Sequence, residues 1–181
     1  MEIRQLDLDR RCDVEQFVRF PFALYRGDPL WAPPLFSSSR FDLDRRHPTH
    51  RHCTVAAFVA QEGRRTVGRI LAMHNRNYVQ HTGRQGAFFG YFECVQHLPT
   101  GVALFQAACD WARARGLCEI SGPRDLIGSS ASGFLVEGFE HPPAMGVPYN
   151  KPYYDTFAKA AGFMQDSDHL SGHLRGDYQL A

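Results

Sequence analysis

The sequence is poor in the features that mark several protein classes. Its five cysteines are odd in number and include no C-x-x-C pair, which favours reduced thiols over a disulfide framework. No apolar run reaches the ~18 residues of a membrane-spanning helix, and the N-terminus does not resemble a signal peptide. The net charge is +1 with no basic block, so we expect neither nucleic acid nor a membrane as a partner. These observations predict a cytoplasmic protein.

No internal repeat, low-complexity run or linker divides the chain. At 181 residues, with 44% hydrophobic and 22% charged residues, the chain is long enough for one well-buried domain and short for two. We therefore expect a single α/β domain over residues 1–181.

The most informative stretch runs from Gly86 to Pro123. Residues 87–95 are almost continuously apolar or aromatic, as in a strand buried on both faces. Pro99, Thr100 and Gly101 suit a helix start, and the apolar stripe that follows predicts an amphipathic helix closed near Gly116. Residues 117–122 read as a second strand. A strand, a crossover helix and a strand imply two parallel neighbours.

Other elements are predicted on both sides of this unit. Period-2 alternation and β-branched residues predict strands, and apolar spacing with Pro and Gly punctuation predicts helices. The predicted elements are a strand at 1–8, a helix from Asp9 or Asp13 that Pro21 interrupts or kinks, an aromatic arm at 20–36, a short helix at 37–46, a hairpin of 53–60 with 66–73, a polar connection at 74–85, a short extended piece at 134–139, a helix at 153–161 and a final strand or hairpin from 163.

Two local clusters suggest ligands but match no established pattern. His47, His50 and His52 lie close together in the sequence, yet their spacing fits no common zinc site, so we expect no metal. The glycines and serines of residues 128–133 suggest a phosphate cradle. However, neither G-x-x-x-x-G-K-[ST] nor G-x-G-x-x-G occurs there.

The order of elements and several short segments resemble the GNAT (GCN5-related N-acetyltransferase) superfamily. The narrower likeness is to an uncharacterised bacterial branch, whose proteins are often longer. That leaves open that this chain is the N-terminal half of a longer architecture. The segments that carry the likeness are FPFALYRGDPLWAPPL (20–35), VGRILAMHN (67–75), FFGYFE (88–93), LVEGFE (135–140) and PYNKPYYDTFAKAAGF (148–163).

The resemblance implies a mixed sheet that splays between its fourth and fifth strands, with acetyl-CoA, or another acyl-CoA, as co-substrate in the gap. Pantetheine would bind backbone near the end of the fourth strand, and pyrophosphate would face the next helix start. The family motif Q/R-x-x-G-x-G/A is matched by Gln96 and Gly101, but Pro99 replaces its middle glycine and removes an N–H donor. The implied cofactor-binding residues are Cys94, Val95, Gln96, Thr100, Gly101 and Val102.

For the chemistry, Glu93 is the candidate base, because burial raises the pKa of a carboxyl toward the range useful for deprotonating an amine. The alternatives are a structural Glu93 paired with an arginine or a backbone N–H, and His97 as the base. Many GNAT enzymes keep an acidic tyrosine at the position of Ala158. Here Tyr154, one turn earlier, is the candidate acid, with a packing role and a surface hydroxyl as its alternative. Cys94 reads as a core residue rather than a nucleophile, and Glu137 is a second candidate acid.

The resemblance predicts an acyl-CoA-dependent N-acyltransferase that acts on a small-molecule or peptide amine. The alternative, favoured by Pro99 and Ala158, is a non-catalytic GNAT-like module for acyl-CoA binding or assembly. The acceptor cannot be read from the sequence, which also leaves a homodimer open.

Overall fold

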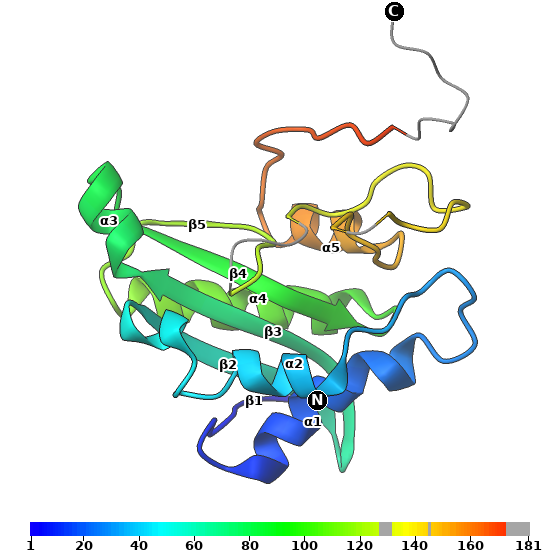
Figure 1. Cartoon of the computed structure of the whole chain (residues 1–181), viewed down its shortest axis with the longest axis horizontal. Coiled ribbons are helices and arrows are strands. Elements are labelled where there is room, and N and C mark those ends of the chain that lie inside the picture. Colours follow the sequence, from blue (N-terminus) through cyan, green and yellow to red (C-terminus); the bar gives the residue numbers. More distant parts are fainter. Residues whose placement is uncertain (127–131, 145, 173–181) are drawn as a thin grey trace, which may run out of the picture.

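The computed structural model describes residues 1–126, 132–144 and 146–172, and its centre is a five-stranded mixed sheet in the order β1-β2-β3-β4-β5 (Figure 1). Neighbouring strands are antiparallel except β4 and β5, which are parallel. The predicted hairpin, buried strand and crossover unit are therefore confirmed. The strands are β1 (Glu2–Gln5), β2 (Cys53–Glu62), β3 (Arg65–Asn75), β4 (Gly86–Cys94) and β5 (Glu119–Ser121).

The predicted helices form with changes at their ends, and a further helix forms within residues 74–85, which were predicted as a polar connection. They are α1 (Arg11–Leu24), α2 (Phe36–Asp42), a 3₁₀ turn η1 (Pro48–Arg51), α3 (Arg76–Thr82), α4 (Leu98–Arg113) and α5 (Tyr154–Ala160).

Helix α1 continues through Pro21 instead of ending there. Proline has no N–H, so the carbonyl four residues earlier, that of Phe17, loses its helical partner. The Arg69 guanidinium of β3 donates to this carbonyl at 2.9 Å, and the bond ties α1 to the sheet.

The two faces of the sheet carry separate apolar cores (Figure 1). Helices α4 and α5 cover one face, where Phe89, Phe92 and Phe105 pack together. Helix α1 covers the other face with Phe17 and Val18 against the sheet. The amphipathic stripes of α1 and α4 account for this arrangement, since each helix buries its apolar side and leaves the polar side in water.

A β-bulge in β4 decides which face its C-terminal residues reach. Gly90 pairs with Leu71 and Glu93 pairs with Arg69, so Tyr91 and Phe92 together oppose the single residue between those partners. Tyr91 takes a left-handed φ of 52°, a costly backbone conformation for a residue with a side chain. Strict alternation from Phe89 would put Glu93 on the α4 face. The extra residue moves Glu93 to the α1 face instead.

Strand β4 has a strand partner on its β5 side over only part of its length. Glu119–Ser121 pairs with Gly86 to Phe88, and Arg124 then donates its N–H to the Phe89 carbonyl at 2.8 Å. The chain passes so close to Gly90 that a Cβ there would overlap the Arg124 carbonyl. Beyond this point, no described strand pairs with the β5-side edge of β4. The sheet is therefore splayed between β4 and β5, as the resemblance implies.

Two of the predicted strands do not form, and a third predicted feature falls mostly on residues that the structure does not describe. No strand forms among the described residues after α5: Met164 and Leu170 are 91% and 100% exposed, so no core packs against the chain there. Residues 134–139 form no strand either. The glycines and serines of the expected phosphate cradle lie mostly at 128–130, outside the described residues.

Within the described ranges, no helix combines the length and apolar character needed to cross a bilayer.

Candidate active site

Glu93 lies near the end of β4, where the sheet is splayed, and it is partly buried. Its Oε2 accepts hydrogen bonds from the hydroxyls of Tyr25 and Tyr154, each at 2.7 Å. No ion pair within 4.0 Å joins Glu93 to an arginine in the described chain. Arg69, which pairs with Glu93 across β3 and β4, acts on the carboxylate electrostatically rather than through a salt bridge. The splay brings together a carboxylate and two phenols.

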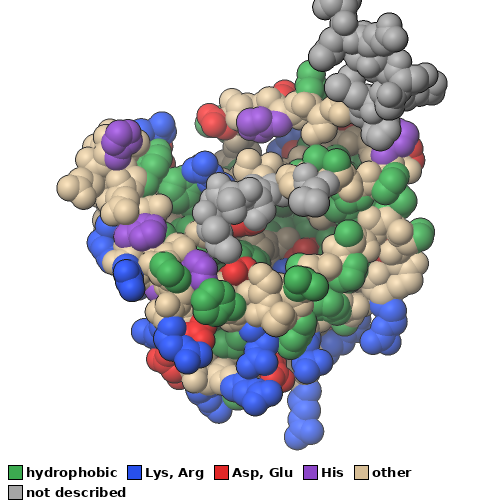
Figure 2. All heavy atoms as spheres, in the orientation of Figure 1, with side chains coloured by type: hydrophobic (Ala, Val, Ile, Leu, Met, Phe, Trp, Pro, Cys, Tyr) green, Lys and Arg blue, Asp and Glu red, His purple; other side chains and the backbone are tan. Residues whose placement is uncertain are grey.

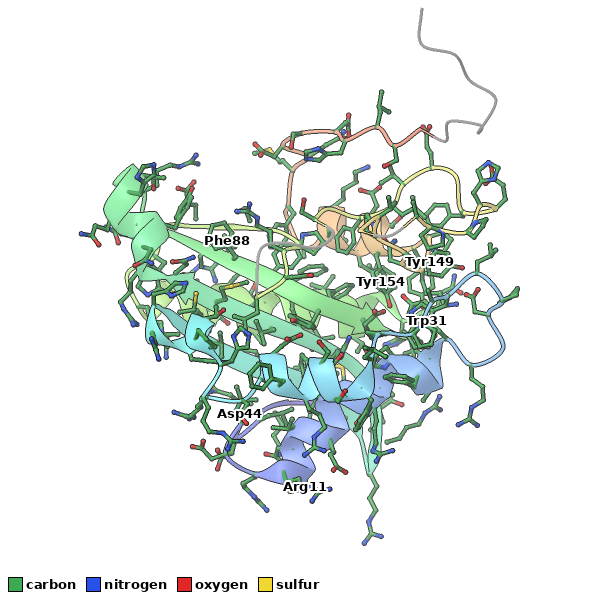
Figure 3. The ribbon with its side chains drawn as sticks, in the orientation of Figure 1. Arg11, Trp31, Asp44, Phe88, Tyr149 and Tyr154 are labelled. Atoms are coloured by element: carbon green, nitrogen blue, oxygen red, sulfur yellow. The ribbon has the colours of Figure 1, made fainter. Side chains whose placement is uncertain are left out.

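The two tyrosines reach the carboxylate from opposite faces of the sheet. Tyr25 is the C-cap of α1 and is 1% exposed, whereas Tyr154 is the first residue of α5 and is 0% exposed. Figure 3 shows Tyr154 beside Tyr149 and Trp31, and the Trp31 ring stacks on Tyr25 with centroids 4.9 Å apart. The hydroxyl of Tyr154 is not at the surface, which excludes the packing alternative in the form predicted.

Burial raises the pKa of Glu93, and this effect outweighs the nearby Arg69 cation and the two tyrosine hydrogen bonds, which favour the carboxylate. Burial and the Glu93 charge raise the pKa of Tyr154 well above its ordinary value. The site thus holds a carboxyl group of increased basicity and a phenol that is a weaker acid than usual.

The backbone of Cys94 meets the same group of tyrosines. Its N–H donates to the Tyr154 hydroxyl oxygen at 2.9 Å, and its carbonyl accepts from the Tyr153 hydroxyl at 2.8 Å. The predicted pantetheine contacts at Cys94 are therefore occupied by side chains in this structure. The N–H of Val95, the next predicted contact, donates to Val67 of β3. Burial raises the pKa of the Cys94 thiol to about 12, so Cys94 is a core residue, as expected from the sequence.

The start of α4, where pyrophosphate is predicted, offers few free donors. His97 is the N-cap, and its carbonyl already accepts the N–H groups of Thr100 and Gly101. Pro99 has no N–H. Within the described residues, Leu98 holds the first-turn N–H for which no partner is found. The Thr100 hydroxyl, which is buried, lies 2.8 Å from the His97 ring Nδ1.

Gly101 is required by packing. A Cβ at this position would overlap the Phe157 ring of α5, so the residue fixes the distance between α4 and α5. The other predicted cofactor residues lie around it: Gln96 is exposed and Val102 is half-buried. Ala158 is buried on α5 and brings no polar atom to the site.

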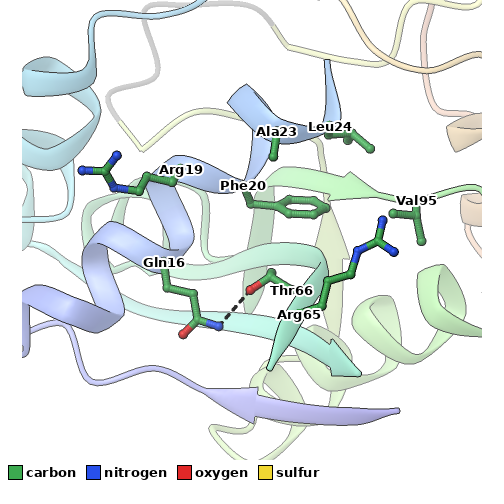
Figure 4. Close-up of a pocket in the computed structure, with 8 residues that line it drawn as sticks. All are labelled: Gln16, Arg19, Phe20, Ala23, Leu24, Arg65, Thr66 and Val95. Carbon is green, nitrogen blue, oxygen red and sulfur yellow. Dashed lines mark hydrogen bonds between the residues drawn. The ribbon is translucent and has the colours of Figure 1, made fainter. Parts of the chain in front are cut away.

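The surface is hollowed in two places. Figure 2 shows a depression in the face that lies between α2 and α5 in Figure 1. A separate hollow of about 460 Å³ adjoins Val95, and Figure 4 shows the Phe20 ring among the side chains that line it. Apolar residues of α1 and two arginines of opposite walls surround the space. Its lining residues are Gln16, Arg19, Phe20, Ala23, Leu24, Arg65, Thr66 and Val95.

A second polar cluster links two loops beside Tyr25. Lys151 Nζ lies 2.9 Å from Asp28 Oδ2 and 4.6 Å from the Tyr25 ring centroid. Tyr149 donates its hydroxyl to Asp28 at 2.9 Å. Sequence reasoning missed Tyr25, Asp28 and Lys151, although all three lie in segments that carry the family resemblance. Nothing in the sequence shows that the 20–35 and 148–163 segments meet at Glu93.

The remaining candidates lie elsewhere. His47 caps η1 by accepting the Thr49 N–H, and His50 contacts the Asp42 carbonyl at 3.0 Å. Glu137 is exposed. Among residues 1–126, 132–144 and 146–172, no three His, Cys, Asp or Glu side chains are grouped as metal ligands.

Comparison with known proteins identifies two curated relatives, while no protein-family model matches the chain. The chain is 34% identical over 159 residues to protein YghO of Escherichia coli K12, covering 88% of this chain and 41% of that protein. It is 32% identical over 158 residues to the bacterial ceramide synthase of Caulobacter vibrioides, covering 86% of this chain and 41% of that enzyme. The chain therefore spans about 41% of the length of the curated relatives it matches.

Solved structures resemble this fold at low sequence identity. An aminoglycoside acetyltransferase from an uncultured soil metagenomic sample matches with a TM-score of 0.58 at 14% identity, over 96% of each chain. A tandem GNAT protein from the clavulanic acid biosynthesis pathway matches with a TM-score of 0.58 at 18% identity, over 89% of this chain and 43% of that one. These likenesses confirm the predicted fold class.

Proposed function

Because the chain has the GNAT acetyltransferase fold, we propose that it transfers an acyl group from acyl-CoA to an amine. One observation carries the proposal: Oε2 of the partly buried Glu93 is held at the splay by two tyrosine hydroxyls. A carboxyl group with a raised pKa in this position suits a base for an amine acceptor.

In the proposed reaction, the acceptor nitrogen attacks the thioester carbonyl carbon. A protonated acceptor first gives one proton to the Glu93 carboxylate; the N–C bond then forms, the C–S bond breaks, and the nitrogen loses its second proton to solvent. A thiol of this kind has a pKa of ~8.5, so the CoA thiolate leaves without an obligatory acid. Without a base, a protonated amine has no lone pair with which to attack. Glu93 is therefore the residue on which turnover depends most.

Tyr154 remains the candidate proton donor to the thiolate, since Glu137, the second candidate, is exposed. Its hydroxyl donates to Glu93 and accepts from the Cys94 N–H. Donation of its proton to the thiolate therefore breaks its hydrogen bond to Glu93. Polarisation of the thioester carbonyl by the Cys94 N–H requires Tyr154 to release that N–H as well. Both roles place the reacting thioester beside Tyr154 and Cys94.

The acceptor class follows from a relative. The Caulobacter relative is named a bacterial ceramide synthase, and a ceramide is by definition an N-acylated long-chain amino alcohol. We therefore propose a long-chain amine as acceptor and a fatty acyl-CoA as donor for the protein to which this chain belongs. The hollow beside Val95, with its apolar wall of α1 residues, is consistent with alkyl chains in this region.

The alternative is a non-catalytic GNAT-like module. Two observations favour it: few backbone N–H groups are free at the start of α4, and tyrosine hydroxyls occupy the N–H and carbonyl of Cys94. Both features reduce the backbone hydrogen bonding available to CoA.

Calorimetry distinguishes the two functions. Acetyl-CoA and palmitoyl-CoA, the latter below its micellar concentration, are titrated into the protein, and thiol release is followed with sphinganine or short amines as acceptors. The proposed function predicts saturable binding and thiol release that requires an amine. Binding without amine-dependent release supports the module. No heat and no thermal shift with millimolar acetyl-CoA or with palmitoyl-CoA would exclude the enzyme.

A further inference from the structure

Tyr25 is built into the candidate site from an element that the proposed reaction does not otherwise use. It caps the C-terminus of α1, and its N–H donates to the Pro21 carbonyl. Trp31 stacks on one side of the ring with an interplanar angle of 13°, and the Lys151 ammonium lies 4.6 Å from the ring centroid. These contacts fix the ring, so the direction of the hydroxyl is fixed as well.

The hydroxyls of Tyr25 and Tyr154 donate to the same oxygen of Glu93. A carboxylate oxygen has two lone-pair sites, and two phenol donors fill both. The carboxylate is therefore held from both faces of the sheet. Its second oxygen, Oε1, is the atom left for another proton donor.

We propose that Tyr25 is a positioning residue of the reaction, holding Oε2 of Glu93 together with Tyr154 so that Oε1 receives the proton of the acceptor amine. This inference rests on the proposed function. In the step itself, the protonated amine gives one proton to Oε1 before the N–C bond forms, the nitrogen loses its second proton to solvent as the C–S bond breaks, and the carboxyl later returns its proton to solvent. Tyr25 does not gain or lose a proton.

Other charged and titratable groups also act on Glu93, and they remain unchanged when Tyr25 is substituted. Arg69 faces it from β3 and Lys151 from the loop before α5, and both stabilise the carboxylate. The two tyrosine hydrogen bonds do the same. Removing one donor therefore raises the pKa of Glu93 while the neighbouring charges remain. The groups coupled to Glu93 from the surrounding elements are Tyr25, Arg69, Cys94, Lys151, Tyr153 and Tyr154.

The test compares Tyr25→Phe with Tyr78→Phe. Tyr78 lies on α3 and packs on Phe88. In the described part of the chain its hydroxyl makes no hydrogen bond to Glu93, so it controls for the loss of a tyrosine hydroxyl. Carbon NMR of the glutamate carboxyls, with Glu93→Gln for assignment, gives the Glu93 pKa in the free protein. The pH dependence of kcat/KM is measured in parallel, and the midpoint of its acid limb is compared with the Glu93 pKa.

In Tyr25→Phe we expect the Glu93 pKa and the acid limb both to move up by about one pH unit, the equivalent of one charge-assisted hydrogen bond. At a pH below both limbs, kcat/KM then falls about tenfold. Tyr78→Phe leaves both unchanged. An unchanged Glu93 pKa overturns the proposal, and so does a raised pKa with an unmoved acid limb.

A second variant covers the case in which Tyr25→Phe does not fold. Site-specific 3-fluorotyrosine at position 25 keeps the ring and makes its hydroxyl a stronger donor, so the Glu93 pKa and the acid limb should both fall. A rise or no change overturns the proposal. If the wild-type protein shows no acyl transfer to any amine tested, the proposed function fails, and Tyr25 cannot be a positioning residue for it. The NMR titration then still shows separately whether Tyr25 stabilises the carboxylate.

Discussion

Arg69 donates its Nη1 proton to the carbonyl of Phe17, the carbonyl that Pro21 leaves without a helical partner. The bond is buried, and the guanidinium carbon lies 4.8 Å from the Phe17 ring centroid. A proline inside α1 thus creates the acceptor for a cation on β3, directly opposite Glu93. The helix that ends at Tyr25 is attached to the strand pair that carries Glu93, the proposed base.

This relationship predicts a coupling between positions 21 and 69. Pro21→Ala supplies an N–H that can close the helical bond to Phe17. The carbonyl then keeps a partner when Arg69→Met removes the guanidinium. We expect Arg69→Met to cost about 1 kcal/mol less in the Pro21→Ala background than in wild type, as one net hydrogen bond implies. A double-mutant cycle of urea unfolding measures this difference, and strict additivity would show that the two residues are independent.

Pro99 predicts a limit on CoA affinity. Pro99→Gly adds one N–H to the first turn of α4, where Thr100 and Gly101 already donate to His97. Acyl-CoA binding should tighten by roughly 0.5–1.5 kcal/mol if pyrophosphate lies at this turn. Calorimetry with acetyl-CoA checks the gain, and Pro99→Ala is the matched control, because it adds the same N–H with less backbone freedom. Equal affinity in all three proteins would place the phosphates elsewhere.

Substitution of Glu93 should reduce kcat/KM more than substitution of Tyr154. Glu93→Gln retains an oxygen that accepts from both tyrosines but removes the base, so kcat/KM should fall by about 10²–10⁴. Tyr154→Phe should cost less, because a thiolate leaves without protonation. The pH–rate profiles of both variants and wild type provide the comparison. Full activity in Glu93→Gln would remove Glu93 from the mechanism, and a larger loss in Tyr154→Phe would reverse the assignment.

The raised pKa of Glu93 also predicts a pH dependence of stability. Burial raises the folded-state pKa above the ordinary value of 4.5, so the folded protein holds this proton more tightly than the unfolded chain. The contribution is complete below about pH 4.5 and is lost as the pH rises through the folded-state pKa. Glu93→Gln, which does not titrate, should gain stability relative to wild type over that rise. Urea midpoints of the two proteins at several pH values measure the difference, and a constant difference would refute the shift.

Much of the fold was predictable because it depends on local signals. Alternation defined the β2–β3 hairpin, the apolar run of β4 marked a strand buried on both faces, and the stripe after Pro99 marked α4. The final strand was predicted wrongly at Met164 and Leu170. Both residues are exposed, and a loose alternation of apolar residues predicts a strand only where one face of it packs against a core.

The sequence by itself determined the hairpin, the parallel crossover and the helix after Pro99, since these follow from periodicity and helix-start chemistry. The roles of Glu93 and Tyr154 stay predictions. Only the tertiary structure decided what surrounds Glu93. The bulge at Tyr91 and Phe92 reverses the face on which Glu93 lies, and no periodicity reports an inserted residue before its partner strand is known. Tyr25 meets Glu93 because α1 and α5 pack on opposite faces of a splayed sheet, a relation between segments distant in the chain that no local pattern contains.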